Sequence, residues 1–80
     1  MKTVNIAYFA SLREEAKLDA ETVTVGCRTY SDLYNELASK HGFSLPAAMI
    51  QAAANDEFVQ MGSEIEEGVR VVFIPPIAGG

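Results

Sequence analysis

Three segments of the chain carry the hydrophobic pattern of β-strands. Residues 2–9 and 21–25 alternate between apolar and polar side chains, which predicts strands with one buried face. The second of these segments is rich in β-branched residues and ends at Gly26. Residues 69–74 are nearly all apolar, which predicts a central strand covered on both faces.

Residues 29–41 have the period of an amphipathic helix. Thr29 is suited to cap the amino end, Asp32 lies in the first turn where the helix dipole favours an anion, and Gly42 follows the last turn. The apolar positions recur at intervals of three and four and form one continuous stripe: Tyr30, Leu33, Tyr34, Leu37, Ala38 and His41.

A shorter helix is predicted between the first two strands. Ser11 and Glu14 have the spacing of a capping box, in which each side chain accepts a hydrogen bond from the backbone N–H of the other residue. We expect this helix to extend to Lys17. Residues 43–49 contain Pro46 and have no clear period, so a loop or an irregular helix is expected there.

The stretch that follows allows two interpretations. The alanines of residues 50–54 favour a helix, whereas the pair at 55–56 followed by an apolar pair at 58–59 is typical of two short strands joined by a turn. We favour the two strands. Residues 62–68 predict a surface turn, solvated or facing a partner, that carries three glutamates: Glu64, Glu66 and Glu67.

The predicted order is strand, short helix, strand, long helix, two short strands and a strong strand. An α+β fold satisfies this order, with a mixed sheet and one main helix packed on one face. For a chain of 80 residues the economical version is the β-grasp, the ubiquitin-like fold. We expect one domain over residues 1–74 and a flexible, extended tail over residues 75–80.

Charge and composition narrow the class of partner. Six Lys and Arg residues against eleven Asp and Glu residues give a net charge of −5, which argues against nucleic acid or an anionic membrane. A basic face of another protein suits this chain better. The sequence shows no leader and no apolar run long enough to cross a bilayer, so we expect a cytoplasmic protein.

No sequence motif for catalysis or metal binding is found in the chain. His41, the one histidine, has no evident nucleophile to activate, and its place in the last helical turn favours a structural role. Cys27, the one cysteine, is more typical of a small packing residue than of a reactive thiol or persulfide carrier. We predict neither a metal site nor a bound cofactor.

The C-terminal residues are the strongest candidate for function. Pro75 and Pro76 stop the last strand and stiffen the chain where it leaves the domain. Beyond them the side chains shrink until the end is bare backbone that can enter a narrow channel: Ile77, Ala78, Gly79 and Gly80. The terminal carboxylate of Gly80 is a poor electrophile until an enzyme activates it, for example as an acyl-adenylate.

Motifs along nearly the whole chain resemble one family. They are residues 8–14 (YFASLRE), the helix at 29–42, Asn55, and Gly68 followed by the apolar strand and the ending 73–80 (FIPPIAGG). In these motifs the sequence resembles the small subunit of molybdopterin synthase, the MoaD type of ubiquitin-like sulfur carrier. The Pro-Pro-Ile-Ala-Gly-Gly ending is the most specific part, because the related thiamine-pathway carriers end in Gly-Gly without the Pro-Pro step.

The resemblance implies a chemical role for Gly80. An E1-like adenylyltransferase would convert its carboxylate to an acyl-adenylate with ATP. A sulfur donor, either a cysteine desulfurase or a rhodanese-like protein, would then produce a thiocarboxylate. This group would donate sulfur to cyclic pyranopterin monophosphate in molybdenum cofactor biosynthesis, so that the small subunit is a covalently loaded co-substrate and no catalyst by itself.

The resemblance also implies a large synthase subunit as the partner, in an assembly of two large and two small subunits. The tail would thread into that subunit with Pro75, Pro76, Ile77, Ala78 and Gly79. Together with Ile77, three aromatic residues are predicted as possible partner contacts, although each of the three equally suits a place in the core: Phe9, Phe58 and Phe73.

Three other functions stay open. The same fold and Gly-Gly ending suit a sulfur carrier for another product, such as the thiamine thiazole. They also suit a ubiquitin-like modifier whose Gly80 is joined to lysines of other proteins. A plain interaction domain with an inert tail is the last hypothesis, because a Gly-Gly end is also typical of frayed or cloned termini.

Overall fold

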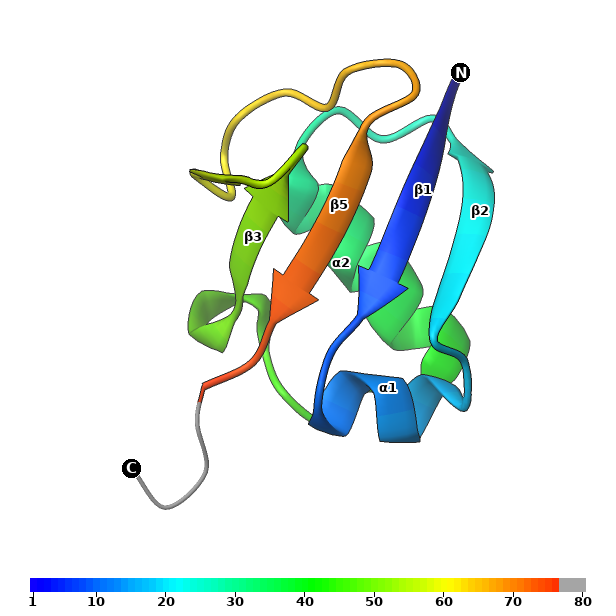
Figure 1. Cartoon of the computed structure of the whole chain (residues 1–80), viewed down its shortest axis with the longest axis vertical. Helices are drawn as coiled ribbons and strands as arrows, with labels where there is room; N and C mark the ends of the chain where they lie inside the picture. Colours follow the sequence, from blue (N-terminus) through cyan, green and yellow to red (C-terminus); the bar gives the residue numbers. More distant parts are fainter. Residues whose placement is uncertain (77–80) are drawn as a thin grey trace.

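The fold is built on a five-stranded mixed sheet with the strand order β2-β1-β5-β3-β4 (Figure 1). The computed structural model describes residues 1–76. β1 and β5 run parallel, whereas the other neighbouring strands pair antiparallel. Along the chain the elements are β1 (Lys2–Tyr8), α1 (Ser11–Ala16), β2 (Ala20–Val25), α2 (Tyr30–His41), the 3₁₀ helix η1 (Ala47–Met49), β3 (Gln51–Ala54), β4 (Glu57–Val59) and β5 (Arg70–Ile74). This arrangement confirms the predicted α+β, ubiquitin-like β-grasp.

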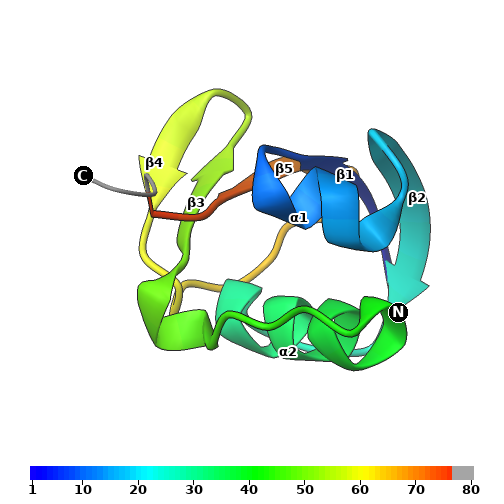
Figure 2. The ribbon, with the colours of Figure 1, turned by 90° about the horizontal axis from the view of Figure 1, so that it is seen from below.

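α2 covers one face of the sheet, and α1 lies at the end where β1 finishes (Figures 1 and 2). The helix α2 begins and ends as predicted. The Oγ1 of Thr29 accepts a hydrogen bond from the N–H of Asp32 at 3.1 Å, and Gly42 takes the left-handed conformation with a φ of 75°. The space between α2 and the sheet is filled by alternate residues of β1 and by the helical stripe: Val4, Ile6, Tyr8, Tyr30, Leu33, Tyr34 and Leu37.

β5 lies at the centre of the sheet, but only one of its faces is covered. Val71 and Phe73 are fully buried, while Val72 and Ile74 on the other face are half-buried. The prediction of cover on both faces is therefore wrong. The helices of residues 1–76 lie on the other side of the sheet or at its end, and the strand neighbours of Val72 are small residues, Ala7 and Ala53 (Figure 2).

The start of α1 differs from the prediction. The helix begins at Ser11 itself and no side chain caps it, so the predicted capping box of Ser11 and Glu14 is wrong. Leu12 and Ala16 are buried, and packing these two residues against the core fixes where the helix starts. The end agrees with the prediction, because Lys17 leaves the helix in the left-handed conformation with a φ of 61°.

The hairpin of β3 and β4 confirms the strand interpretation of this stretch. Asn55 and Asp56 form its turn with φ values of 50° and 72°, the backbone that a tight hairpin of this kind requires. The Oδ1 of Asn55 also accepts a hydrogen bond from the N–H of Arg70 at 3.0 Å, and the N–H of Asn55 donates to the Arg70 carbonyl at 2.8 Å. Asn55 therefore fastens the hairpin to β5.

The connection between β4 and β5 is a surface turn over residues 62–68, as predicted, and Ile65 anchors it to the core. Ile65 is buried, its N–H donates to the carbonyl of Arg28 at 2.8 Å, and its carbonyl accepts a hydrogen bond from Lys2. The three glutamates of this connection are exposed: Glu64, Glu66 and Glu67.

Glu21 of β2 links three elements of the fold. Its carboxylate accepts hydrogen bonds from the hydroxyl of Tyr8 in β1 and from Lys40 Nζ at 2.8 Å, and it lies 2.5 Å from Nε2 of His41. Burial alone would raise the pKa of Glu21, but the hydrogen bonds from Lys40, Tyr8 and His41 outweigh burial and lower this pKa from 4.5 to about 2. Burial, together with the hydrogen bond to Glu21, raises the pKa of Tyr8. His41 thus has a structural partner.

We expect acid to weaken the fold through Glu21, whose side chain is only 13% exposed. Because the pKa is lower in the folded than in the unfolded state, the stabilisation is complete above pH 4.5 and is lost as the pH falls toward 2. The shift corresponds to roughly 3 kcal/mol. Glu21→Gln should lower the free energy of unfolding at neutral pH and flatten its dependence on acid, as measured by urea denaturation.

The exposed Glu66 supplies the control for this experiment, because its side chain forms no hydrogen bond or ion pair within residues 1–76. Glu66→Gln should keep the wild-type pH dependence. An acid profile of Glu21→Gln that matches the wild type would contradict the role given to Glu21.

Candidate functional site

The candidate site is the place where the chain leaves β5. This strand is held on both sides, by β1 and by β3, and its last residue Ile74 pairs with Gln51 of β3. Pro75 is buried and Pro76 is exposed, so the chain reaches the surface between the two prolines. The rest of the predicted arm, Ile77, Ala78, Gly79 and Gly80, lies outside the described residues.

Two hollows flank this exit and share one wall, made by Ile74 and the two prolines. The larger hollow, about 530 Å³, lies on the side of α1 and is also lined by Phe9, Ala10, Ser11 and Glu14. The smaller hollow, about 300 Å³, lies on the side of η1 and β3 and is also lined by Met49 and Gln51. A protein that takes hold of the tail at Pro76 must therefore approach both hollows.

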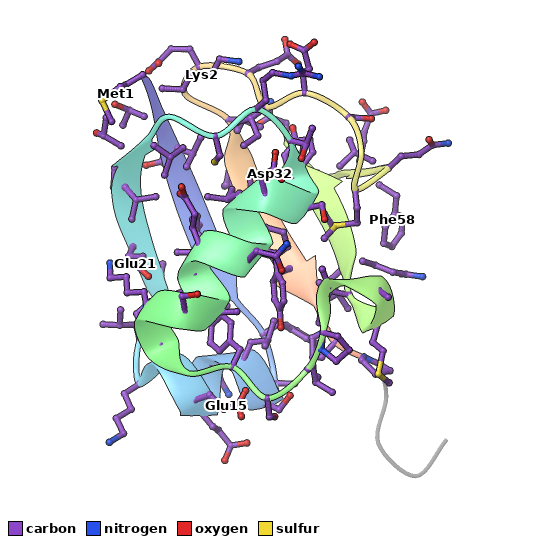
Figure 3. All side chains as sticks on the ribbon, turned by 180° about the vertical axis from the view of Figure 1, so that it is seen from behind. Met1, Lys2, Glu15, Glu21, Asp32 and Phe58 are labelled. Atoms are coloured by element: carbon purple, nitrogen blue, oxygen red, sulfur yellow. The ribbon has the colours of Figure 1, made fainter. Side chains whose placement is uncertain are left out.

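Two of the three predicted aromatic contacts lie on the surface. Phe9 is 58% exposed beside the exit, and Phe58 is 73% exposed at the β4 edge, where its ring points away from the domain (Figure 3). The prediction for Phe73 is wrong, because this residue is fully buried and its ring packs edge-on against Tyr34 with centroids 5.4 Å apart. Side chains alternate along a strand, so Ile74 is the residue that faces outward instead.

Sequence reasoning missed Ile74, Met49 and Glu14 as residues of the exit. Alternation along β5, counted from the charged Arg70, would have placed Phe73 inside and Ile74 outside. Met49 and Glu14 reach the exit only because η1 and α1 pack beside it, and no local pattern reveals that packing.

Other sites for chemistry find little support in residues 1–76. Cys27 is half-buried, and burial, with the carboxylate of Glu36 nearby, raises the pKa of its thiol, which disfavours the reactive thiolate. No group of three or more His, Cys, Asp or Glu side chains in this part of the chain is arranged to hold a metal ion. None of its helices is both long and apolar enough to span a membrane.

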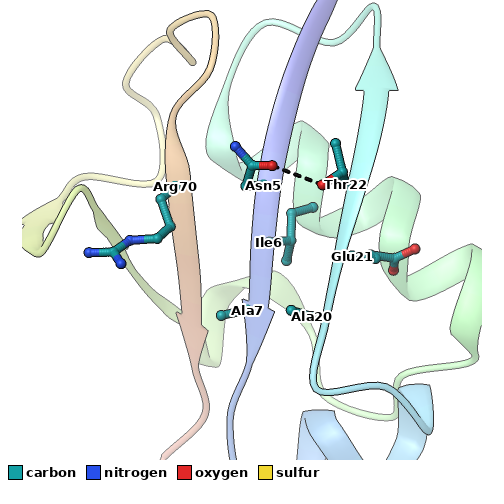
Figure 4. Close-up of a pocket in the computed structure, with 7 residues that line it drawn as sticks. All are labelled: Asn5, Ile6, Ala7, Ala20, Glu21, Thr22 and Arg70. Carbon is teal, nitrogen blue, oxygen red and sulfur yellow. Dashed lines mark hydrogen bonds between the residues drawn. The ribbon is translucent and has the colours of Figure 1, made fainter.

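Another hollow of about 300 Å³ lies on the open face of the sheet (Figure 4). It is lined by Asn5, Ile6, Ala7, Ala20, Glu21, Thr22 and Arg70. Its polar groups already have partners: Thr22 Oγ1 donates to Asn5 Oδ1 at 2.8 Å, and Arg70 pairs with Asp56 at 2.6 Å. Glu21 is held in the network described above. We assign no chemistry to this hollow.

Comparison with known proteins identifies the family to which this chain belongs. The model described as the ThiS family matches residues 6–80, which include the exit and the whole tail. The chain belongs to the ThiS family. The molybdopterin synthase sulfur carrier subunit of Escherichia coli (strain K12) is 28% identical to this ThiS-family chain over 80 residues, which cover 96% of this chain and 99% of that protein.

Solved structures share the fold over nearly the whole chain. Molybdopterin converting factor, subunit 1, of Pyrococcus furiosus is 26% identical, covers 96% of this chain and 100% of its own, and superposes with a TM-score of 0.77. SAMP1 of Haloferax volcanii is 25% identical, covers 98% and 99%, and has a TM-score of 0.77. A chain in the complex of subunits 1 and 2 of the Helicobacter pylori 26695 molybdopterin-converting factor is 19% identical, covers 98% and 99%, and has a TM-score of 0.65, which shows a common fold.

We expect Phe73 and Phe58 to contribute very differently to the stability of this ThiS-family domain. Phe73→Ala should lower the free energy of unfolding by about 3–5 kcal/mol, because it leaves a cavity beside Tyr34. Phe58→Ala should change it by less than about 1 kcal/mol, because that ring is already in water. Urea denaturation of both variants measures the difference, and similar losses would contradict the placement of the two rings.

Proposed function

We propose that this ThiS-family chain is the sulfur carrier subunit of a molybdopterin synthase and that Gly80 carries the sulfur. The main support is the strand that bears the tail: β5 is held between two neighbours, and the sequence beyond Pro76 tapers to Gly79 and Gly80. The name of the Escherichia coli relative, which is similar over nearly its whole length, agrees with this proposal.

The proposed chemistry begins at the carboxylate of Gly80. One of its oxygens attacks the α-phosphate of ATP on an E1-like adenylyltransferase, pyrophosphate leaves, and an acyl-adenylate forms. The persulfide sulfur of a cysteine desulfurase or a rhodanese-like donor then displaces AMP, and a thiol reduces the resulting acyl disulfide to the thiocarboxylate. Thiocarboxylate sulfur is softer and more nucleophilic than carboxylate oxygen. It attacks cyclic pyranopterin monophosphate, and a second loaded carrier delivers the other sulfur of the dithiolene.

In this proposal the domain presents the tail, and the large subunit supplies the active site. The two hollows at the exit have mostly apolar walls and one ionisable side chain, Glu14, so they contain no acid–base pair. Positioning and stabilisation of the reacting groups would come from the partner's pocket. The Helicobacter pylori complex of subunits 1 and 2, one chain of which has this fold, supports a large-subunit partner. Exposed Phe9 and Phe58 remain predicted contacts with it.

Loading of Gly80 is tested by intact mass spectrometry. After incubation with ATP, a sulfur donor and a matching E1-like enzyme, the chain should gain the mass difference between sulfur and oxygen. Fragmentation should place that gain on Gly80. A chain that lacks Gly79 and Gly80 is the control and should gain nothing. An unchanged mass with an enzyme proven active on a close relative would speak against the carrier function.

Removal of Gly79 and Gly80 should abolish sulfur transfer without unfolding the domain. The buried core of residues 1–76 extends from β1 to β5, and a glycine has no side chain to add to it, so the free energy of unfolding should stay within about 0.5 kcal/mol of the wild type. Synthesis of molybdopterin with the large subunit in a reconstituted system should fall to background. Full synthesis by the truncated chain would instead support an interaction domain with an inert tail.

A protein modifier is the second candidate function. SAMP1 of Haloferax volcanii, a small archaeal modifier protein by name, shares the fold at 25% identity. Both functions begin with adenylation of Gly80 and differ in the group that takes the acyl carbon, a sulfur donor or a lysine amine. Lysine-linked adducts of high mass in the loading experiment would favour the modifier. A carrier for another product would load sulfur and then fail to convert cyclic pyranopterin monophosphate.

A further inference from the structure

One carboxylate stands among apolar side chains where the tail leaves the domain. Of the residues that line the larger exit hollow, Glu14 is the charged one, and the smaller hollow on the other side is lined by uncharged residues alone. Glu14 is exposed. Within residues 1–76 its side chain forms no ion pair and no hydrogen bond, and Arg13 beside it on α1 pairs with Asp19 at 3.8 Å instead.

A partner that encloses the tail has to cover this carboxylate. Pro76 is part of the wall of the hollow and is also the point from which the tail leaves, so a pocket that closes around the tail lies against that wall. Phe9, with more than half of its surface exposed, forms another part of the wall. Covering Glu14 with apolar surface would strip water from a charged group without replacement, which is strongly unfavourable. A positive charge brought by the partner offsets this loss better than a neutral donor does, because hydrogen bonds between two charged groups are the stronger ones.

Arginine fits the hollow better than lysine does. A planar guanidinium can form two parallel hydrogen bonds with a carboxylate and can at the same time stack on an aromatic ring. Glu14 and the exposed ring of Phe9 line the same hollow and offer both of these contacts. The apolar stem of an arginine can lie against Pro76.

We propose that the large subunit places an arginine side chain in the hollow between Phe9, Glu14 and Pro76, and that this ion pair fixes the direction in which the tail enters its pocket. The inference rests on the proposed function, because it names a contact of the same partner. It adds a polar determinant to a surface otherwise recognised through apolar contacts.

The test is isothermal titration calorimetry, in which the full chain is titrated into the purified large subunit of the same organism. Glu14→Gln keeps the shape of the side chain and removes its charge, and it should raise the dissociation constant about tenfold. Glu14→Arg should raise it about a hundredfold, because it places two cations together. Added salt should weaken binding of the wild type more than binding of Glu14→Gln.

Glu66 supplies the matched control, because it is an exposed glutamate in the β4–β5 connection, away from the residues of the exit. Glu66→Gln and Glu66→Arg should bind within about twofold of the wild type. Thermal unfolding of each variant checks that it is folded.

The outcomes separate the inference from the proposed function. If the wild type binds and both Glu14 variants bind equally well, the inference is overturned and the carrier function stands. Equal losses in the Glu14 and Glu66 variants would indicate a general attraction between charged surfaces and would also overturn it. If the folded wild type does not bind the large subunit at all, the proposed function falls and the inference falls with it.

Discussion

The pairing of β5 between β1 and β3 is the constraint on which the rest of the molecule depends. It joins the first strand of the chain to the last, in parallel, so the connection between them has to cross the sheet through α2. Closing such a long loop costs entropy that is offset only when the whole core has assembled. The tail therefore extends from a fixed point only in a fully folded domain, and its partners meet it in one orientation.

Two glutamates show that the acidic residues of this domain have different roles. The role of each depends on how exposed its carboxylate is and on which side chains it contacts. Glu21 is half-buried among three donors and stabilises the contact of the helix α2 with the first two strands. Glu14, on the surface of α1, has no such partners within residues 1–76 and faces the exit of the tail. The β4–β5 connection, which carries three exposed glutamates, lies at the end of the sheet opposite to the one where β5 finishes (Figure 1). A net charge of −5 thus includes residues with a structural contact and residues that are left for solvent or partners.

The sequence was sufficient to predict the fold because the strongest patterns are also those of the core. The stripe on α2 and the alternation in β1 predict both the elements and the faces that they bury. Prediction failed where the answer depended on which elements pack against each other in the folded chain. The run of apolar residues in β5 did not reveal that one of its faces is open, and the sequence left Phe73 undecided between a partner contact and the core, where it lies. At the candidate site the end of β5 at Pro75 and Pro76 could be predicted, because proline acts locally, whereas Glu14 and Met49 could not.

The geometry of the exit also determines how the domain bears mechanical load. β5 is hydrogen-bonded along both edges, and its parallel neighbour β1 begins at the far end of the sheet (Figure 1). A force that acts along β5 at its last residue strains its hydrogen bonds to β1 and β3 in shear all at once, and it does not peel them apart one by one. The domain can therefore stay folded while such a force acts on the end of β5.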